Sequence, residues 1–237
     1  MSTKIGIIAE GPMDHCLLPP LLERIAKERA DYDWPVLADD MAEFFFIRKR
    51  GFGGVVETVR RLVEALDAGK FDHAFFVILL DRRTKAAQSD IKALLKNRNR
   101  FVLGIAIEEI EAWWLGDREN TLVWSGLKDG LPNDCRYGRE DYRSERDDNP
   151  KKTLDELTRI SGRFDRCYGE GNVDLAQEFA EDFWRRHARL NDIRAQCPQG
   201  YRPFERAATQ QFRSASRRAG RLFGRPKEDD VRRDNHR

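Results

Sequence analysis

Four short apolar runs alternate with amphipathic patterns along the first half of this chain, and this alternation restricts its fold more than any other feature. The runs occupy residues 4–9, 44–47, 74–80 and 101–107. Aliphatic residues at helical spacing follow each run, at residues 17–29, 55–66, 91–95 and 108–115. A strand–helix order repeated in this way predicts an α/β fold with a mostly parallel sheet and helices on both faces.

The second half of the chain carries helical patterns and no further strand signal. These patterns lie at residues 154–160, 173–184, 188–195 and 204–218. Residues 134–152 are dense in charge and poor in aliphatic side chains, so we expect a surface loop there. The later helices form either a separate subdomain or a cover for the first core. We therefore expect an α/β domain at 1–118, a helical C-terminal part at 119–220 and a basic, disordered tail at 221–237.

Composition narrows the class of protein. The apolar start breaks at Glu10 and the longest apolar run spans only residues 74–80, so neither a signal peptide nor a membrane span is expected. The four cysteines show no metal-ligand spacing, which disfavours a zinc site and fits reduced thiols in the cytoplasm. Residues 213–237 hold nine Lys or Arg against four Asp or Glu, which suits either nucleic-acid binding or a solubilising end.

Acidic residues stand directly after the predicted strands. Glu10 follows the first run and Asp81 the third, and the carboxyl ends of parallel strands meet at one edge of a sheet. Asp14 lies four residues after Glu10, where it can share a metal ion or simply cap a helix. Carboxylates crowded at one edge repel one another, and Mg²⁺, which prefers oxygen ligands, removes that penalty.

Three glutamates follow the fourth run, at positions 108, 109 and 111. Residues three apart share a face of a helix, whereas adjacent residues diverge. We therefore expect Glu108 and Glu111 to face the acidic edge together, and the two tryptophans that follow them to pack in the core.

Two of these acidic motifs resemble a known domain. Glu10-Gly11-Pro12-Met13-Asp14 and Leu79-Leu80-Asp81 resemble the Toprim domain of primases and nucleases, which carries a Glu on its first strand-to-helix turn and an Asp-x-Asp after a later strand. The Glu-x-x-x-Asp spacing looks most like the overcoming-lysogenisation-defect branch. That resemblance implies a Toprim-like sheet and a metal-dependent nuclease.

A closer resemblance covers most of residues 4–207. The stretch Ile107-Glu108-Glu109-Ile110-Glu111-Ala112-Trp113-Trp114-Leu115-Gly116-Asp117 is similar to a motif of the bacterial family called domain of unknown function 4276. Asn149-Pro150-Lys151-Lys152-Thr153-Leu154, Cys197-Pro198 and Phe204 are similar to its later motifs. The resemblance implies an ATPase partner of the structural-maintenance (ABC) type and a role in phage or plasmid defence.

The resemblance also implies roles for particular residues. Glu10, Asp14, Asp81 and Glu108 would hold Mg²⁺ or Mn²⁺, with Glu108 or Glu111 completing the shell or taking a proton. Arg83 stands where the second Asp of Asp-x-Asp is expected, and Arg83 or Lys85 would stabilise the transition state of phosphodiester hydrolysis. Three readings stay open: a metal-dependent nuclease, a non-catalytic binding or regulatory subunit in which Arg83 marks the loss of activity, and a phosphoryl-transfer enzyme acting on a small molecule, such as a phosphatase.

A basic, glycine-rich segment precedes the second predicted helix. Arg48, Lys49 and Arg50 stand before three glycines at 51, 53 and 54, where backbone amides can receive a nucleic-acid phosphate. A plain connection between a strand and a helix explains the glycines equally well. No Gly-Lys-Ser/Thr pattern is present, so the segment does not predict nucleotide hydrolysis.

Overall fold

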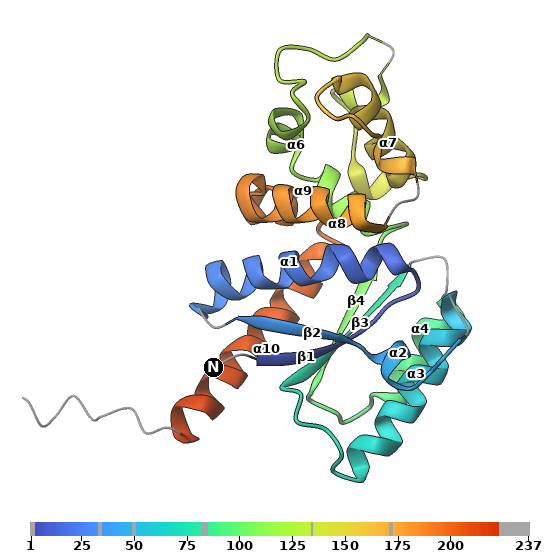
Figure 1. Ribbon diagram of the computed structural model, residues 1–237, viewed down its shortest axis with the longest axis vertical. Helices are drawn as coiled ribbons and strands as arrows, with labels where there is room; N and C mark the ends of the chain where they lie inside the picture. Colours follow the sequence, from blue (N-terminus) through green and yellow to red (C-terminus); the bar gives the residue numbers. More distant parts are fainter. Residues whose placement is uncertain are drawn as a thin grey trace, which may run out of the picture.

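The computed structural model describes residues 3–32, 35–48, 51–81, 85–133, 135–170 and 173–222. A parallel sheet lies at its centre, with strands in the order β2-β1-β3-β4 (Figure 1). The strands are β1 (Thr3–Ile8), β2 (Val36–Asp40), β3 (Phe75–Asp81) and β4 (Phe101–Ala106). The predicted α/β class with a parallel sheet and a helical C-terminal part is confirmed.

Ten α-helices surround or extend this sheet within the described residues. They are α1 (Pro12–Ala30), α2 (Met41–Phe44), α3 (Gly51–Asp67), α4 (Lys85–Leu94), α5 (Glu111–Leu115), α6 (Arg118–Ser125), α7 (Pro150–Ser161), α8 (Val173–Asp182), α9 (Leu190–Gln196) and α10 (Tyr201–Leu222). A π-helical turn, Phe183–His187, follows α8, and 3-10 turns lie at Arg136–Gly138, Ser144–Arg146 and Tyr168–Glu170. None of the helices in the described ranges is long and apolar enough to cross a bilayer.

Both faces of the sheet are buried, which explains why β3 is apolar from Phe75 to Leu80. Phe75, Val77 and Leu79 belong to the cluster shared with α1 and α10, whereas Phe76, Ile78 and Leu80 belong to the cluster shared with α2, α3 and α4. Successive side chains of a strand point to opposite faces, so a strand covered on both sides needs an apolar residue at every position.

The prediction of the second strand at residues 44–47 is wrong. The strand is β2, which pairs with β1 from Thr3↔Val36 to Ile7↔Asp40. The Asp40 side chain then accepts hydrogen bonds from the amides of Ala42 (2.8 Å) and Glu43 (3.4 Å) and starts the short helix α2. The aromatic residues after it close a turn in which Phe46 has φ +57°. A side-chain cap therefore ends the extended backbone before the aromatic run begins.

The last helix, α10, completes the core of the sheet. Of the two alternatives for the C-terminal helices, a separate subdomain or a cover for the first core, α10 follows the second. Phe212 of α10 packs against Phe75, with ring centroids 5.0 Å apart. A Cβ atom on Gly104 of β4 would lie 2.8 Å from the Phe204 ring, so α10 rests directly on that strand. Helix α1 contacts both α8 and α10, and Figure 1 shows α6 to α9 stacked beyond α1, away from the sheet.

The predicted surface loop at residues 134–152 agrees with the structure in part: residues 135–149 contain only short 3-10 turns, but several of their side chains turn inward, and α7 begins at Pro150. Tyr137, Ser144, Glu145 and Asp147 are buried there. Their polar atoms find partners inside the protein: the Tyr137 hydroxyl, for example, donates to the Leu115 carbonyl at 3.0 Å. Most charged side chains of this segment are exposed, whereas Glu145 and Asp147 are buried and hydrogen-bonded inside the protein.

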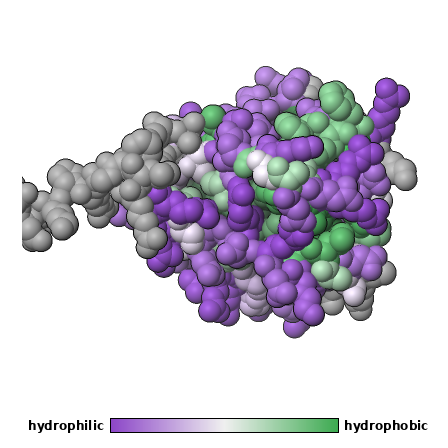
Figure 2. Space-filling model, turned by 90° about the horizontal axis from the view of Figure 1, so that it is seen from below, coloured by the Kyte–Doolittle hydropathy of each residue, from purple (hydrophilic) through white to green (hydrophobic). Residues whose placement is uncertain are grey.

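The surface is otherwise strongly polar, as the 35% of charged residues leads one to expect. Figure 2, seen from below, shows mainly hydrophilic residues, with hydrophobic ones gathered on the side where Figure 1 places α3 and α4. Helix α10 runs to Leu222, and residues 223–237, most of the predicted basic tail, lie outside the described residues.

Candidate functional site

The structure brings Glu10 and Asp81 together at the carboxyl edge of the sheet. They follow the neighbouring strands β1 and β3, whose pairing runs to Ile8↔Ile78. A Glu10 carboxylate oxygen accepts a hydrogen bond from the Asp81 backbone amide at 3.1 Å. Two acids 71 positions apart in sequence therefore meet at one place, as the parallel sheet predicts.

Asp14 joins this edge from the first turn of α1. Its carboxylate accepts a hydrogen bond from the Gly11 amide at 3.0 Å, so it also acts as a helix cap. Burial raises the pKa of Asp14 well above its ordinary value, and the charges of Glu111, Asp81 and, more weakly, Glu10 raise it further. The cap does not conflict with the site reading of Asp14, because the same carboxylate also interacts with the other acids.

Glu111 reaches the same cluster from the start of α5. Only 4% of the residue is exposed, and its carboxylate accepts a hydrogen bond from the Tyr168 hydroxyl at 2.7 Å. Burial raises the pKa of Glu111, the Tyr168 hydrogen bond opposes that rise, and the charge of Glu109 adds to it. We call Glu10, Asp14, Asp81 and Glu111 the acidic edge.

Tyr168 is a residue that sequence reasoning missed. It lies in a 3-10 turn 57 positions after Glu111, and burial together with the Glu111 carboxylate raises the pKa of its phenol well above the ordinary value. Nothing in the local sequence marks such a pair, since the contact depends on how α5 and the turn before α8 pack.

The expectation that Glu108 and Glu111 share a helical face is wrong. Glu108 has φ +69° and precedes α5, which begins only at Glu111, so the spacing rule for helices does not apply to it. Glu109 instead points toward α7, where its carboxylate accepts a hydrogen bond from the Lys151 amide at 3.1 Å. Helix N-termini favour acidic groups, so Glu109 stabilises the start of α7.

A pocket of about 360 Å³ adjoins the acidic edge on the β2 side. Glu10, His15, Asp40 and Arg48 line it, and the His15 ring nitrogen lies 3.5 Å from the Asp40 carboxylate. Burial lowers the pKa of His15, although the nearby Asp40 and Glu43 charges oppose the shift. The pocket therefore combines an acid of the edge with one of the predicted phosphate-binding residues, Arg48.

The other predicted basic residues are not placed by the structure. Lys49, Arg50 and Arg83 lie outside the described residues, and Lys85 starts α4 with a side chain that is not described. The backbone nevertheless connects this region to the edge, because the Gly51 amide donates to the Glu10 carbonyl at 3.1 Å.

The donors of the acidic edge fit a hard cation in kind but are not gathered around one point. All of them are carboxylate oxygens, the ligands that Mg²⁺ and Mn²⁺ prefer. Within the part of the chain that the structure describes, no three acidic, histidine or cysteine side chains stand close enough to hold one ion as they are. Side-chain rotations would have to accompany binding.

Comparisons with known proteins leave these residues as the main guide to function. The chain matches no protein-family model, no curated protein and no solved structure.

Proposed function

We propose that the acidic edge binds Mg²⁺ or Mn²⁺ and that the protein hydrolyses phosphodiester bonds of nucleic acid, as a nuclease of the Toprim type. The observation that carries the proposal is the meeting of Glu10 and Asp81 at two strand ends, beside an Asp14 whose pKa is raised by burial and further by three neighbouring carboxylates. Such crowding of like charges is costly in the folded protein, and perturbed carboxyls of this kind gather at functional sites.

Glu10, Asp81 and Asp14 are the residues that would hold the cation. When bound, a divalent cation supplies charge that polarises a phosphodiester and lowers the pKa of a water molecule. Glu111 would serve as the proton acceptor or donor, because its raised pKa lets it hold a proton at a higher pH than an ordinary glutamate. Arg48, in the adjoining pocket, offers a guanidinium to a phosphate oxygen.

The resemblance to the Toprim and unknown-function families adds the wider setting to this proposal. It implies a cytoplasmic protein that works with an ATPase of the structural-maintenance type in defence against phages or plasmids. The nuclease itself can be tested without that partner.

The test is hydrolysis of supercoiled plasmid DNA and of a labelled RNA by the purified protein with Mg²⁺ or Mn²⁺. Glu10→Gln and Asp81→Asn should each lower the rate at least about a hundredfold, and a chelator should abolish it. Asp72→Asn is a matched control, since Asp72 precedes the same strand that Asp81 ends and is 76% exposed. Undiminished hydrolysis by either edge variant, or none by the wild type, would contradict the proposal.

A second candidate is a non-catalytic binding or regulatory subunit. One observation favours it: Asp14, Glu109 and Glu111 already accept hydrogen bonds from Gly11, Lys151 and Tyr168, as structural acids do. Calorimetry separates the two functions. Mg²⁺ or Mn²⁺ should bind the wild type and not Glu10→Gln if the edge is a metal site, and neither protein if it is only structural.

A further inference from the structure

A second charged site lies at the other end of α1, around a hollow of about 440 Å³. Five arginines from three helices line it: Arg29 of α1, Arg194 of α9, and Arg206, Arg213 and Arg217 of α10. We call this hollow the arginine pocket. The residues at positions 14 and 29 are 15 apart on α1, so it lies roughly 22 Å from the acidic edge at ~1.5 Å per residue.

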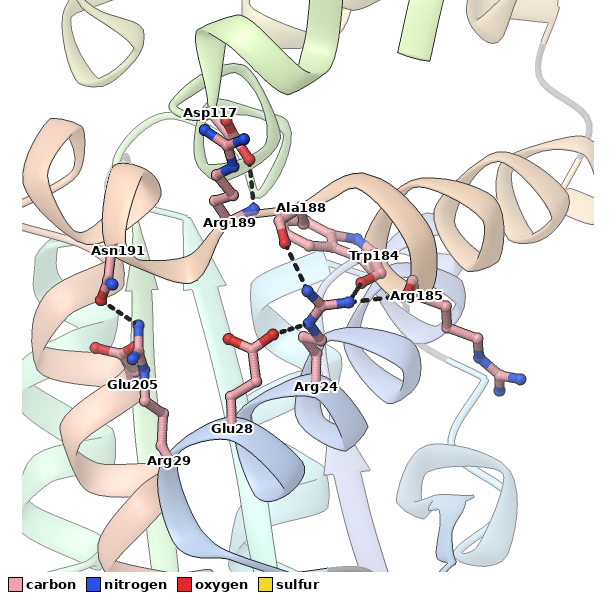
Figure 3. Close-up of polar contacts among 10 residues, drawn as sticks. All are labelled: Arg24, Glu28, Arg29, Asp117, Trp184, Arg185, Ala188, Arg189, Asn191 and Glu205. Atoms are coloured by element: carbon pink, nitrogen blue, oxygen red, sulfur yellow. Dashed lines mark hydrogen bonds and ion pairs between the residues drawn. The ribbon is translucent and has the colours of Figure 1, made fainter. Parts of the chain in front are cut away.

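The arginine pocket is cationic because the single acid that lines it, Glu205, is paired with two of its five arginines. Five arginines and one glutamate give a net charge of +4 (5 − 1). Glu205 is 3% exposed, accepts a hydrogen bond from Arg29 at 2.7 Å and lies 3.6 Å from Arg194. Figure 3 shows Arg29 held between Glu205 and Asn191, to which it donates at 2.7 Å.

The scaffold under these arginines is rigid. Helix α10 buries Tyr201, Phe204, Ala208 and Phe212 against the sheet and α1, so its opposite face is fixed toward solvent. Arg213 also ties α10 to α1 by donating to the Arg29 carbonyl at 2.8 Å.

The exposed face of α10 is a stripe of arginines. Arg202, Arg206, Arg213 and Arg217 are all exposed and fall at intervals close to whole helical turns. From 202 to 217 the stripe extends over roughly 22 Å, with ~6 Å between residues four apart. A straight row of positive side chains on a firmly packed helix suits a ligand whose negative charges are held at regular spacing.

We infer that the arginine pocket and the α10 stripe bind the phosphodiester backbone of duplex DNA. Guanidinium groups stay charged at all physiological pH values and match phosphate oxygens with paired N–H donors. A duplex presents its phosphates already ordered, whereas a single strand would lose conformational freedom on a rigid row. The inference rests on the proposed function only in taking nucleic acid as the class of ligand. The arginines attract the phosphodiester backbone, which the acidic edge repels when no metal is bound.

The experiment measures binding of a labelled 20-base-pair DNA duplex in the presence of a chelator, where metal-dependent hydrolysis is absent. Arg206→Glu/Arg217→Glu should raise Kd roughly tenfold or more and reduce the slope of log K against log salt by about 2. The control, Lys70→Glu/Lys92→Glu, makes the same change of −4 in net charge at two exposed lysines beyond the other face of the sheet. It should change Kd less than about threefold.

The outcomes separate this inference from the proposed function. Equal losses of affinity in the two double variants mean that only net charge matters, and unchanged affinity in the α10 variant means that the stripe serves another ligand; either result overturns the inference. A wild-type protein that binds the duplex but hydrolyses no nucleic acid in Mg²⁺ or Mn²⁺ refutes the proposed function alone. Thermal unfolding of each variant checks that it is folded.

Discussion

Two groups of acids in this protein differ in their surroundings. In the C-terminal part, Asp147 accepts hydrogen bonds from Tyr142, Asn149 and Thr153, and Glu145 accepts two from the amides of Gln199 and Gly200. At the acidic edge, the pKa of Asp14 is raised by burial and by three other carboxylates. The first region collects several donors around each acid, whereas the acids of the second, which also have donors, lie close enough for their charges to interact.

The groups that surround a carboxylate distinguish structural acids from candidate site acids more reliably than the burial of the carboxylate does. Burial raises the pKa of Asp117 as well, but the donors from Arg189 and Asn120 oppose the shift, and Asp117 connects α6 to the end of the π-helical turn (Figure 3). A buried carboxylate surrounded by donors stabilises a fold. One surrounded by carboxylates costs free energy, which suggests selection for something other than stability.

The largest effect that this comparison predicts is the loss of Asp147. Asp147→Ala should lower the free energy of unfolding by about 3–5 kcal/mol, because it leaves the buried Tyr142 and Thr153 hydroxyls without their acceptor. Urea unfolding measures it. Asp148→Ala is the control: its side chain is 85% exposed and binds the same Arg136, so it should cost under about 1 kcal/mol. Equal costs at the two positions would refute the distinction.

Glu205 should show an intermediate effect. Glu205→Gln removes the charge that pairs with Arg29 and Arg194 in a nearly buried position, and we expect a loss of about 2 kcal/mol in urea unfolding. Glu28→Gln removes the charge that pairs with Arg24, and Glu28 is more exposed than Glu205. This variant should lower the free energy of unfolding by about 0.5 kcal/mol or less. A Glu205 variant as stable as its control would mean that the arginine pocket does not depend on its buried acid.

The parts of the fold that follow from local pattern could be predicted. Six of the seven apolar residues of the third run lie in β3, and the acids at the carboxyl ends of β1 and β3 come together because parallel strands share an edge. The sequence left two roles open for Asp14, a helix cap and a site residue. The structure shows why: its carboxylate accepts the Gly11 hydrogen bond at the start of α1, and its charge interacts with the other acids.

The parts of the fold and of the candidate site that depend on competing sequence patterns or on tertiary packing could not be predicted. Val36–Asp40 ends in two acids and looks less like a strand than the aromatic run after it, yet the Asp40 cap decides the outcome. Glu108 has a left-handed backbone conformation, which usually favours glycine. The helical spacing rule therefore could not predict where its side chain lies. The Tyr168–Glu111 hydrogen bond joins distant segments and depends on tertiary packing alone.

The smallest effect, and the sharpest test of the comparison, has the opposite sign. In a chelator at pH 7, Asp14→Asn should raise the free energy of unfolding by about 1 kcal/mol, the usual gain when a strained site residue is replaced. The amide oxygen can still accept the Gly11 hydrogen bond, so the cap survives while the repulsion disappears.

The pH dependence of that gain follows from the direction of the shift. Because folding raises the pKa of Asp14 above its ordinary value of 3.8, the folded protein binds the proton more tightly, and stability falls as pH rises from that value through the folded pKa. The advantage of Asp14→Asn should therefore vanish below the ordinary pKa, in urea unfolding at a series of pH values. Asp40→Asn, a cap on α2 outside the acidic edge, should show no gain. Saturating Mg²⁺ should erase the advantage of Asp14→Asn at pH 7 if a cation relieves the same repulsion, and an advantage that persists in Mg²⁺ would remove Asp14 from the metal site.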